Sequence, residues 1–473
     1  MLFNSMTFLW LFLPVLILVY FVVEKKWRNY VLLIFSLIFY AWGEPKYVIL
    51  MLISIIVNYV FGRLIGGVKT KNKKRMWLIF DIVFNLGLLG YFKYFSFLLT
   101  SFNNILGGTI NVPDIALPIG ISFYTFQIMS YVIDLYRGEI RVQKNIFKLA
   151  LYIAFFPQLI AGPIVKYHDI DRELEHRQET QEKFAYGIRR FVTGLSKKVL
   201  IADTMAIVAD TVFESDLSGV TQWMSWLAIA CYSLQIFFDF SGYSDMAIGL
   251  GSMFGFHFPE NFNLPYISGS VTEFWRRWHI SLSTWFKEYL YIPLGGNRKG
   301  KTRTYINLWI VFIATGVWHG AAWSFVAWGI FQGFFIFVER LGLKKLLDKC
   351  RVLNHIYLII VMMVGWVIFR APSLVVGLKY IKIMFFGQDV AIPLQMYDFI
   401  NHKTWFILVV GILFSGVVQV LYKKVMSGRR ESFRLKLKRI VRWFEPVLVG
   451  VELLVCIMMI VNNTYSSFIY FRF

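Results

Sequence analysis

Long segments without a charged residue are the feature that most constrains the fold of this chain. One of them runs from Thr304 to Val338, between a basic stretch at 297–303 and the pair Glu339-Arg340. A helix of about 18 apolar residues can already cross a bilayer. Hydrophobic residues make up 58% of the 473 residues, and no polar stretch is long enough for a separate soluble domain. The pattern predicts an all-α polytopic integral membrane protein.

The basic residues set the expected orientation of this protein. They gather in loops at 69–75 and 423–439, which the positive-inside rule places in the cytoplasm, with the N-terminus outside. The net charge of +21 is then a property of membrane loops that face lipid head groups, and not of a nucleic-acid-binding surface. Spans are predicted near 7–23, 29–43, 46–65, 77–100, 199–214, 222–256, 355–370, 404–422 and 443–462.

We expect one membrane domain over 1–473, with about eleven transmembrane helices in all. The N-terminal spans occupy 1–116, a core with broken segments and a cytoplasmic face occupies 117–340, and the C-terminal spans occupy 341–473. The segment 101–116 is expected to be a polar external loop, and 166–198 a polar helical hairpin on the cytoplasmic surface.

Two apolar segments, 117–127 and 155–164, are interrupted by proline and glycine. Lipid cannot satisfy the backbone groups that such breaks release, so both segments must be buried in protein or line a cavity. Re-entrant elements are the reading we prefer, and ordinary kinked helices are the alternative.

His319 stands inside the charge-free run. In a continuous helix it would lie about 24 Å from Arg303, beyond the middle of a hydrocarbon layer about 30 Å thick. An ionisable side chain at that depth is a candidate functional group. Histidine also exchanges protons near neutral pH, so His319 is the candidate general acid and base.

Other polar residues fall in the predicted spans and would each need a partner or water. They suggest a shared polar tunnel, although a structural hydrogen bond is the competing explanation for each aspartate. The candidates are Gln235, Asp239, Ser241, Asp245, Thr315, Trp318 and Ser324.

The stretch 272–286 combines aromatic residues with two arginines. On one helix, Trp275, Trp278, His279 and Trp285 would share much of a face. With Arg276 and Arg277 they suit a nucleotide-bearing acyl donor, with the base stacked and the phosphates paired. An interfacial helix anchored by tryptophan remains the alternative, and His279 is either a catalytic helper or a structural residue.

Metal and disulfide chemistry have little support in the sequence. No histidine has metal-ligand spacing, so no metal is expected. The three cysteines, Cys231, Cys350 and Cys456, show no paired spacing, so no disulfide framework is expected.

Several motifs together resemble the membrane-bound O-acyltransferase family, and within it the branch that serves alginate and similar bacterial polysaccharides. Trp-His-Gly at 318–320 and FWRRWH at 274–279 carry most of the resemblance, which extends over essentially the whole chain. The further matching segments are 1–5 with Phe8-Leu9, 39–43, 117–127, 155–163, 239–247, 261–263, 280–285 and 468–473.

The resemblance implies a ring of helices around a thinned centre, with a funnel or tunnel that reaches an essential histidine, here His319. It implies acetyl-CoA as donor at the cytoplasmic face, a bacterial inner-membrane location and no bound cofactor. It also implies an extracytoplasmic partner, a hydrolase-like acetyltransferase that modifies the polysaccharide. Residues 274–279 would then hold the donor through Trp275, Arg276, Arg277 and Trp278.

Two other functions stay open. A related enzyme of the same superfamily would transfer D-alanine to teichoic acid or acetylate a lipid or peptidoglycan hydroxyl. A transporter for glycan or lipid would use His319 and the aspartates only as a proton relay.

Overall fold

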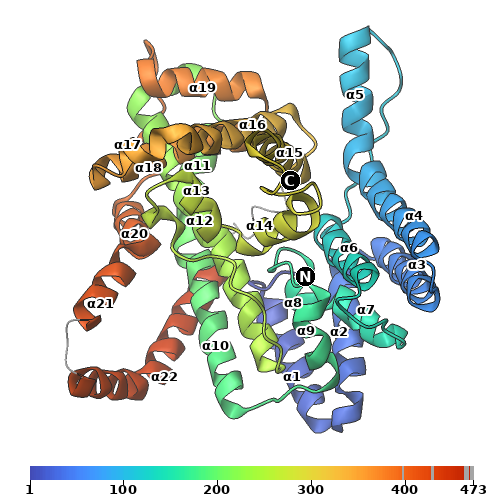
Figure 1. Cartoon of the computed structure of the whole chain (residues 1–473). Coiled ribbons are helices and arrows are strands. Elements are labelled where there is room, and N and C mark those ends of the chain that lie inside the picture. The colour runs from blue at the N-terminus through green and yellow to red at the C-terminus, as the bar shows by residue number, and fades with distance from the viewer. Residues whose placement is uncertain (397–398, 428–430, 463–467, 469–473) are drawn as a thin grey trace. The chain divides into compact units, whose positions relative to one another are not determined.

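The computed structural model describes residues 1–396, 399–427, 431–462 and 468 (Figure 1). Within these ranges every extended regular element is a helix, which confirms the all-α prediction. Arg429 and Arg430 of the basic loop, and residues 469–473 of the C-terminal motif, lie outside the described residues.

Six of the described helices are long and apolar enough to cross a membrane. They include five of the nine predicted spans, while the spans predicted near 7–23, 29–43, 199–214 and 222–256 are helices outside these six. The six are Tyr47–Gly67, Lys71–Leu106, Trp323–Leu347, Arg351–Arg370, His402–Ser427 and Trp443–Asn462.

The chain forms two compact units. Unit 1 contains residues 1–191 and 246–259, and unit 2 contains 192–245 and 260–473. The helices that begin in unit 1 are α1 (Leu13–Val22), α2 (Arg28–Gly43), α3 (Tyr47–Gly67), α4 (Lys71–Leu89), α5 (Phe95–Leu106), α6 (Ile121–Arg137), α7 (Ile146–Ala154), α8 (Phe156–Leu159), α9 (Tyr167–Glu175) and α10 (Gln181–Ser196).

The first spans of unit 1 agree with the hydropathy pattern, but α5 continues to Leu106. The prediction of a loop from residue 101 was therefore wrong for its first six positions. The helix ends where Gly107 adopts a left-handed conformation with φ 65°, which glycine reaches without steric cost.

The two broken segments of unit 1 pack against each other. Gly120 has φ 78°, and α6 begins at the next residue. A Cβ atom at Gly120 would lie 2.7 Å from the carbonyl oxygen of Leu159, so only glycine allows this approach. Most of 121–135 and 149–165 is buried, as the interrupted backbone requires.

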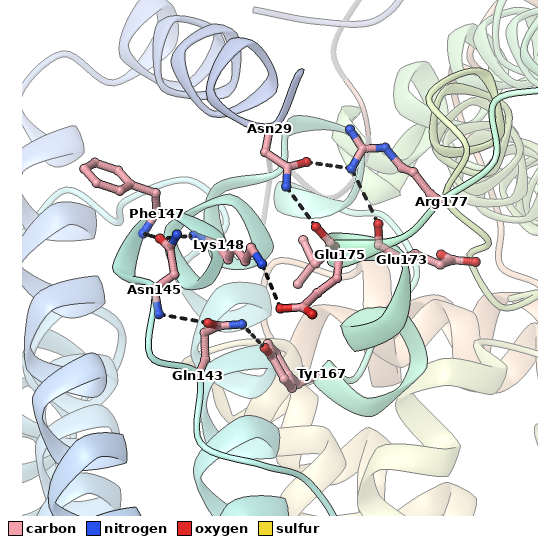
Figure 2. A network of polar contacts seen from close by, with 10 residues as sticks. Asn29, Gln143, Asn145, Phe147, Lys148, Tyr167, Glu173, Glu175 and Arg177 are labelled. Atoms are coloured by element: carbon pink, nitrogen blue, oxygen red, sulfur yellow. Dashed lines mark hydrogen bonds and ion pairs between the residues drawn. The ribbon is translucent and has the colours of Figure 1, made fainter. Parts of the chain in front are cut away.

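A polar network joins the predicted surface hairpin, which is confirmed as the helices α9 and α10, to α2 (Figure 2). Asn29 donates to the carbonyl of Leu174 at 2.8 Å and accepts from Arg177 at 2.6 Å. Lys148 of α7 pairs with Glu175 at 2.7 Å. These contacts fix the turn after α9 within unit 1.

In unit 2, a π-helical segment η4 (Lys197–Ala202) continues α10 into α11. The helix α12 contributes its part up to Asp245 to this unit. The remaining helices are α11 (Asp203–Glu214), α12 (Gln222–Met253), α13 (Val271–Arg277), α14 (Ile280–Phe286), α15 (Lys301–His319), α16 (Trp323–Val338), α17 (Lys344–Leu347), α18 (Arg351–Arg370), α19 (Leu374–Phe386), α20 (His402–Ile412), α21 (Val418–Ser427) and α22 (Glu431–Asn462).

The charge-free run is a helical hairpin and not one continuous helix. Its arms α15 and α16 lie side by side (Figure 1). A Cβ atom at Gly316 would lie 2.4 Å from the carbonyl oxygen of Phe325 and 3.2 Å from the Cα atom of Gly329. Glycines on both arms thus let the backbones approach closely, as small residues do in membrane helix pairs.

Candidate active site

His319 is the last residue of α15, at the turn of the hairpin. Its imidazole is 6% exposed and lies among aromatic rings. The ring centroids of Trp318 and Trp328 are each 5.1 Å away, and that of Phe369 is 5.2 Å away. An aromatic enclosure of this kind restricts water around the histidine and orients its ring.

Gly320 makes the turn possible. A Cβ atom at this position would lie 2.1 Å from Cε2 of Phe325, far inside van der Waals contact. The Trp-His-Gly sequence therefore has a local structural reason: the glycine lets the chain reverse tightly against α16 directly after the histidine.

His279 interrupts the predicted helix 272–286, so the expectation of one continuous helix was wrong. Its φ of 45° separates α13 from α14. Backbone hydrogen bonds on both sides hold this uncommon conformation. Asn263 N–H donates to the carbonyl of Arg277 at 2.9 Å, and Ile280 N–H donates to the carbonyl of Asn261 at 3.0 Å.

The side chain of Asn261 determines which nitrogen of His279 carries the proton. The backbone N–H of Ser281 can only donate, and it meets Asn261 Oδ1 at 3.2 Å. The amide nitrogen Nδ2 in turn donates to Ser244 Oγ at 3.1 Å. Since Oδ1 is an acceptor, His279 Nδ1, 3.2 Å away, must be the donor. The lone pair of neutral His279 is then on Nε2.

Nε2 of His279 is buried and has no hydrogen-bond partner among the described residues. His279 lies outside the six candidate spans, and burial together with the nearby His319 holds its pKa well below the ordinary value of 6.5. A neutral imidazole with an uncommitted lone pair in a dry environment is suited to accept a proton.

The structure brings the two predicted histidines together around Trp318. The ring centroid of Trp318 lies 6.1 Å from that of His279 and 5.1 Å from that of His319. On its other side His279 packs edge-on against Phe240 of α12 at 4.7 Å. Three predicted site residues, His319, His279 and Trp318, therefore form one buried cluster.

The predicted aspartates are held by lysines. Lys198, which is 1% exposed, lies 2.7 Å from a carboxylate oxygen of Asp239 and 2.7 Å from one of Asp203. Lys197 lies 2.6 Å from Asp245. Such pairs stabilise charges inside a membrane protein, which favours the structural explanation for both aspartates.

The remaining predicted tunnel residues are buried and lie on three different helices. Thr315 donates to the carbonyl of Val311 one turn earlier, at 2.8 Å. Gln235 and Ser241 lie on the buried part of α12, 3% and 1% exposed, and Ser324 begins α16 with 2%.

The four predicted donor residues lie in different environments. Trp278 is in the core, 2% exposed, where its ring stacks on Phe274 at 5.3 Å. Arg277 pairs with Glu273 at 2.8 Å. Arg276 is exposed. Trp275 donates from Nε1 to Gln332 Oε1 of α16 at 3.2 Å.

Two contributors were missed by sequence reasoning. Asn261 begins the motif segment 261–263 but carries no charge and stands in a short loop, so its contact with His279 depends on the fold. Lys198 lies in a polar stretch, and only the register of η4 turns it inward onto the aspartates. Among the residues that the structure describes, no group of three or more His, Cys, Asp or Glu side chains could hold a metal ion.

Comparison with known proteins identifies the family. Residues 137–380 match MBOAT, the membrane-bound O-acyltransferase family. The chain is 46% identical to a probable alginate O-acetylase of Pseudomonas aeruginosa, over 81% of this chain and 75% of that protein. It is 35% identical to a peptidoglycan O-acetyltransferase of Helicobacter pylori, over 100% of this chain and 98% of that protein.

A more distant relative is named for the transfer of a different acyl group. A teichoic acid D-alanyltransferase of Bacillus subtilis is 31% identical over 45% of this chain and 56% of its own length. The apolar helical fold and the acyltransferase relatives together define a membrane-embedded acyltransferase. The chain belongs to the membrane-bound O-acyltransferase family, and it is an acyltransferase.

Proposed function

We propose that this protein takes an acetyl group from acetyl-CoA at the cytoplasmic face and passes it on for O-acetylation of an extracytoplasmic polysaccharide. The observation that carries the proposal is the buried cluster of His319 and His279, with a lone pair on His279 Nε2 and an aromatic enclosure around His319. The similarity to the alginate O-acetylase supports the acetyl group and the polysaccharide.

The chemistry requires one base and one acid. The acceptor hydroxyl loses its proton to His319 as its oxygen attacks the thioester carbonyl. The carbon–sulfur bond then breaks, and the imidazolium returns the proton to the thiolate, which leaves as CoA thiol. His279 lies in the same cluster, and its neutral Nε2 can hold a hydroxyl or relay the proton.

The donor is proposed to dock near α13. Acetyl-CoA carries several phosphates and must stay where cations meet water, while its slender arm reaches the histidines. Arg276 is the exposed cation on this helix, since Arg277 is paired with Glu273. Trp275, whose indole N–H donates to Gln332, is the residue of this helix that we propose to stack on the adenine.

We place the protein in a bacterial inner membrane with the N-terminus outside, in contact with lipid. The acceptor side requires an extracytoplasmic hydrolase-like acetyltransferase that receives or guides the acetyl group. Peptidoglycan O-acetylation is the second candidate, because similarity to the H. pylori enzyme extends over 100% of this chain.

His319→Ala tests the proposal. We expect the variant to insert at normal levels and to lose acetyl transfer by at least ~10²-fold, since general acid–base catalysis contributes that much or more. Membrane levels and glycan acetylation should be measured in the same cells. Near-normal acetylation at normal levels would refute the assignment, and a wild type without transfer would favour the transporter.

Titration of acetyl-CoA tests the donor site. Arg276→Ala should weaken binding to purified protein in detergent, and Arg277→Ala should weaken it less, because Arg277 is neutralised by Glu273. Unchanged affinity in the Arg276 variant would leave that arginine as a lipid anchor only.

A further inference from the structure

A buried carboxylate outside the histidine cluster collects hydrogen bonds from the first turn of α13. Glu339 begins the π-helical segment η8 (Glu339–Leu343) directly after α16, and is 3% exposed. Val271 N–H donates to Oε1 at 2.6 Å, and Thr272 N–H donates to Oε2 at 2.9 Å. The hydroxyl of Thr272 also donates to Oε2 at 2.6 Å.

A fourth donor comes from α18. The hydroxyl of Tyr357 lies 3.2 Å from Oε1 of Glu339. The two oxygens of a carboxylate only accept hydrogen bonds, so Glu339 can satisfy all four donors as a carboxylate. No neutral side chain of this length offers the same acceptors. Glu339 therefore ties α13 and α18 to the C-terminal end of α16.

A second contact between α13 and α16 lies about two turns before Glu339 on α16. Trp275 of α13 donates to Oε1 of Gln332 on α16. Gln332 is 0% exposed and precedes Glu339 by about 10 Å along a helix. Two separated contacts define both the position and the rotation of α13 on α16.

The same helix α16 also positions His319. Its Gly329 packs on Gly316 of α15, and its Trp328 lies against the His319 ring. The other helix, α13, ends one residue before the turn Trp278-His279. Both histidines are thus positioned by contacts with α16: His319 directly through Trp328, and His279 through the packing of α13 on Gln332.

We propose that Glu339 is a positioning residue that holds α13, and with it Trp275 and His279, in register with His319. This inference rests on the proposed function, since it concerns the geometry of acyl transfer. A small displacement between donor and base is enough to slow a transfer reaction by orders of magnitude, although neither helix unfolds.

Glu339→Gln tests this role in the full-length protein in detergent. The amide nitrogen would face donors where a carboxylate oxygen now accepts, so α13 should shift. We expect kcat per folded molecule to fall at least 10-fold, and the KM for acetyl-CoA to rise as well, because α13 also carries Trp275 and Arg276. A merely structural role would lower the folded fraction and leave kcat per folded molecule unchanged.

Arg340→Gln is the matched control, because Arg340 is the next residue and is exposed. It should keep wild-type kcat. Glu339→Asp keeps the charge and should retain more activity than Glu339→Gln. If Glu339→Gln does not fold, Thr272→Val decides, since it removes one donor and should lower kcat about 2-fold to 5-fold while the carboxylate stays paired.

Hydrogen exchange over 271–277 gives a readout independent of activity. We expect faster exchange of these amides in Glu339→Gln and not in Arg340→Gln. Unchanged exchange together with unchanged kcat per folded molecule would overturn the positioning role. Absence of transfer in the wild type would instead refute the proposed function, while the exchange result still decides whether Glu339 holds α13.

Discussion

Asn261 controls a histidine without taking part in chemistry itself. Its Oδ1 accepts from His279 Nδ1, from the backbone N–H of Ser281 and from the Ser281 hydroxyl, the last at 2.9 Å. The amide therefore fixes the ring orientation and the tautomer at once. Acid–base residues are commonly oriented by such a third group.

Asn261→Ala tests whether this contact supports folding and acetyl transfer. The Ser281 N–H would lose its acceptor, at a cost of about 1–3 kcal/mol in unfolding free energy. His279 would lose its tautomer control, and we expect acetyl transfer to fall roughly 10²-fold. Asn263→Ala is the control, because Asn263 contributes backbone atoms to the same pairing. Equal activity of the two variants would contradict this role.

At this scale the sequence predicted the burial of His319, because a lone histidine in a charge-free run is rare and costly; its catalytic role stays a prediction. It could not predict that Asp239 and Asp245 find lysines, since those partners come from another helix and depend on the register of η4. For the same reason it did not reveal Asn261.

The α15–α16 hairpin is the element on which the site depends. Hydropathy alone cannot separate two short antiparallel helices from one long helix when the turn between them is apolar. Gly316, Gly320 and Gly329 are the signal that distinguishes them, because each lies where a Cβ atom would meet the opposite arm. The break at His279 had no such signal, since its conformation is imposed by pairing with 261–263.

Gly320→Ala should disrupt this hairpin. The added methyl group would collide with the Phe325 ring, and overpacking of this kind typically costs about 1–3 kcal/mol. We expect a lower unfolding temperature and loss of acetyl transfer. Gly450→Ala in α22 is the control, because nothing lies within 4 Å of its Cβ position. A Gly320 variant as stable and active as the control would disprove the tight turn.

The turn between α9 and α10 should respond to acid. Burial opposes ionisation of Glu179, but the hydrogen bond from Tyr20 and the charges of Arg177 and Arg28 together hold its pKa below the ordinary value of 4.5. A carboxyl group whose pKa is lower in the folded protein than in the unfolded chain stabilises the fold at pH values above the unfolded pKa. This contribution disappears as the pH falls through the folded pKa.

Thermal unfolding in detergent between pH 7.5 and 3.5 would measure this contribution. At pH 7.5, Glu179→Gln should unfold about 1–3 °C below the wild type, and the difference should close toward pH 3.5. Glu182→Gln, at an exposed position of α10, should match the wild type throughout. A difference of the same size at pH 3.5 as at pH 7.5 would show that ionisation of Glu179 is not its source.

For the whole molecule, the sequence predicted the all-α membrane class and most spans. The reason is that apolar segments and basic clusters are patterns that extend over tens of residues. It was less successful between 117 and 340. There the polar and aromatic segments owe their placement to contacts between distant parts of the chain, such as Gly120 against Leu159.

The orientation can be tested by cysteine labelling from outside intact cells, in a background without Cys231, Cys350 and Cys456. Lys73→Cys in α4 and Ser427→Cys at the end of α21 should stay unlabelled, since both lie in basic segments that we expect inside. Asn104→Cys, exposed near the end of α5, should be labelled. Labelling of either basic loop would reverse the proposed topology.

The lysines of η4 also bear on how the chain enters the bilayer during synthesis. Asp239 and Asp245 arrive with α12, and both form ion pairs with lysines made some forty residues earlier. Lipid offers no comparable partner, so we expect α10, η4 and α11 to wait at the insertion machinery until α12 joins them. A glycosylation tag placed after α12 would report misdirected insertion in a Lys198→Ala chain, and the order of synthesis is then part of what lets buried acids enter the membrane.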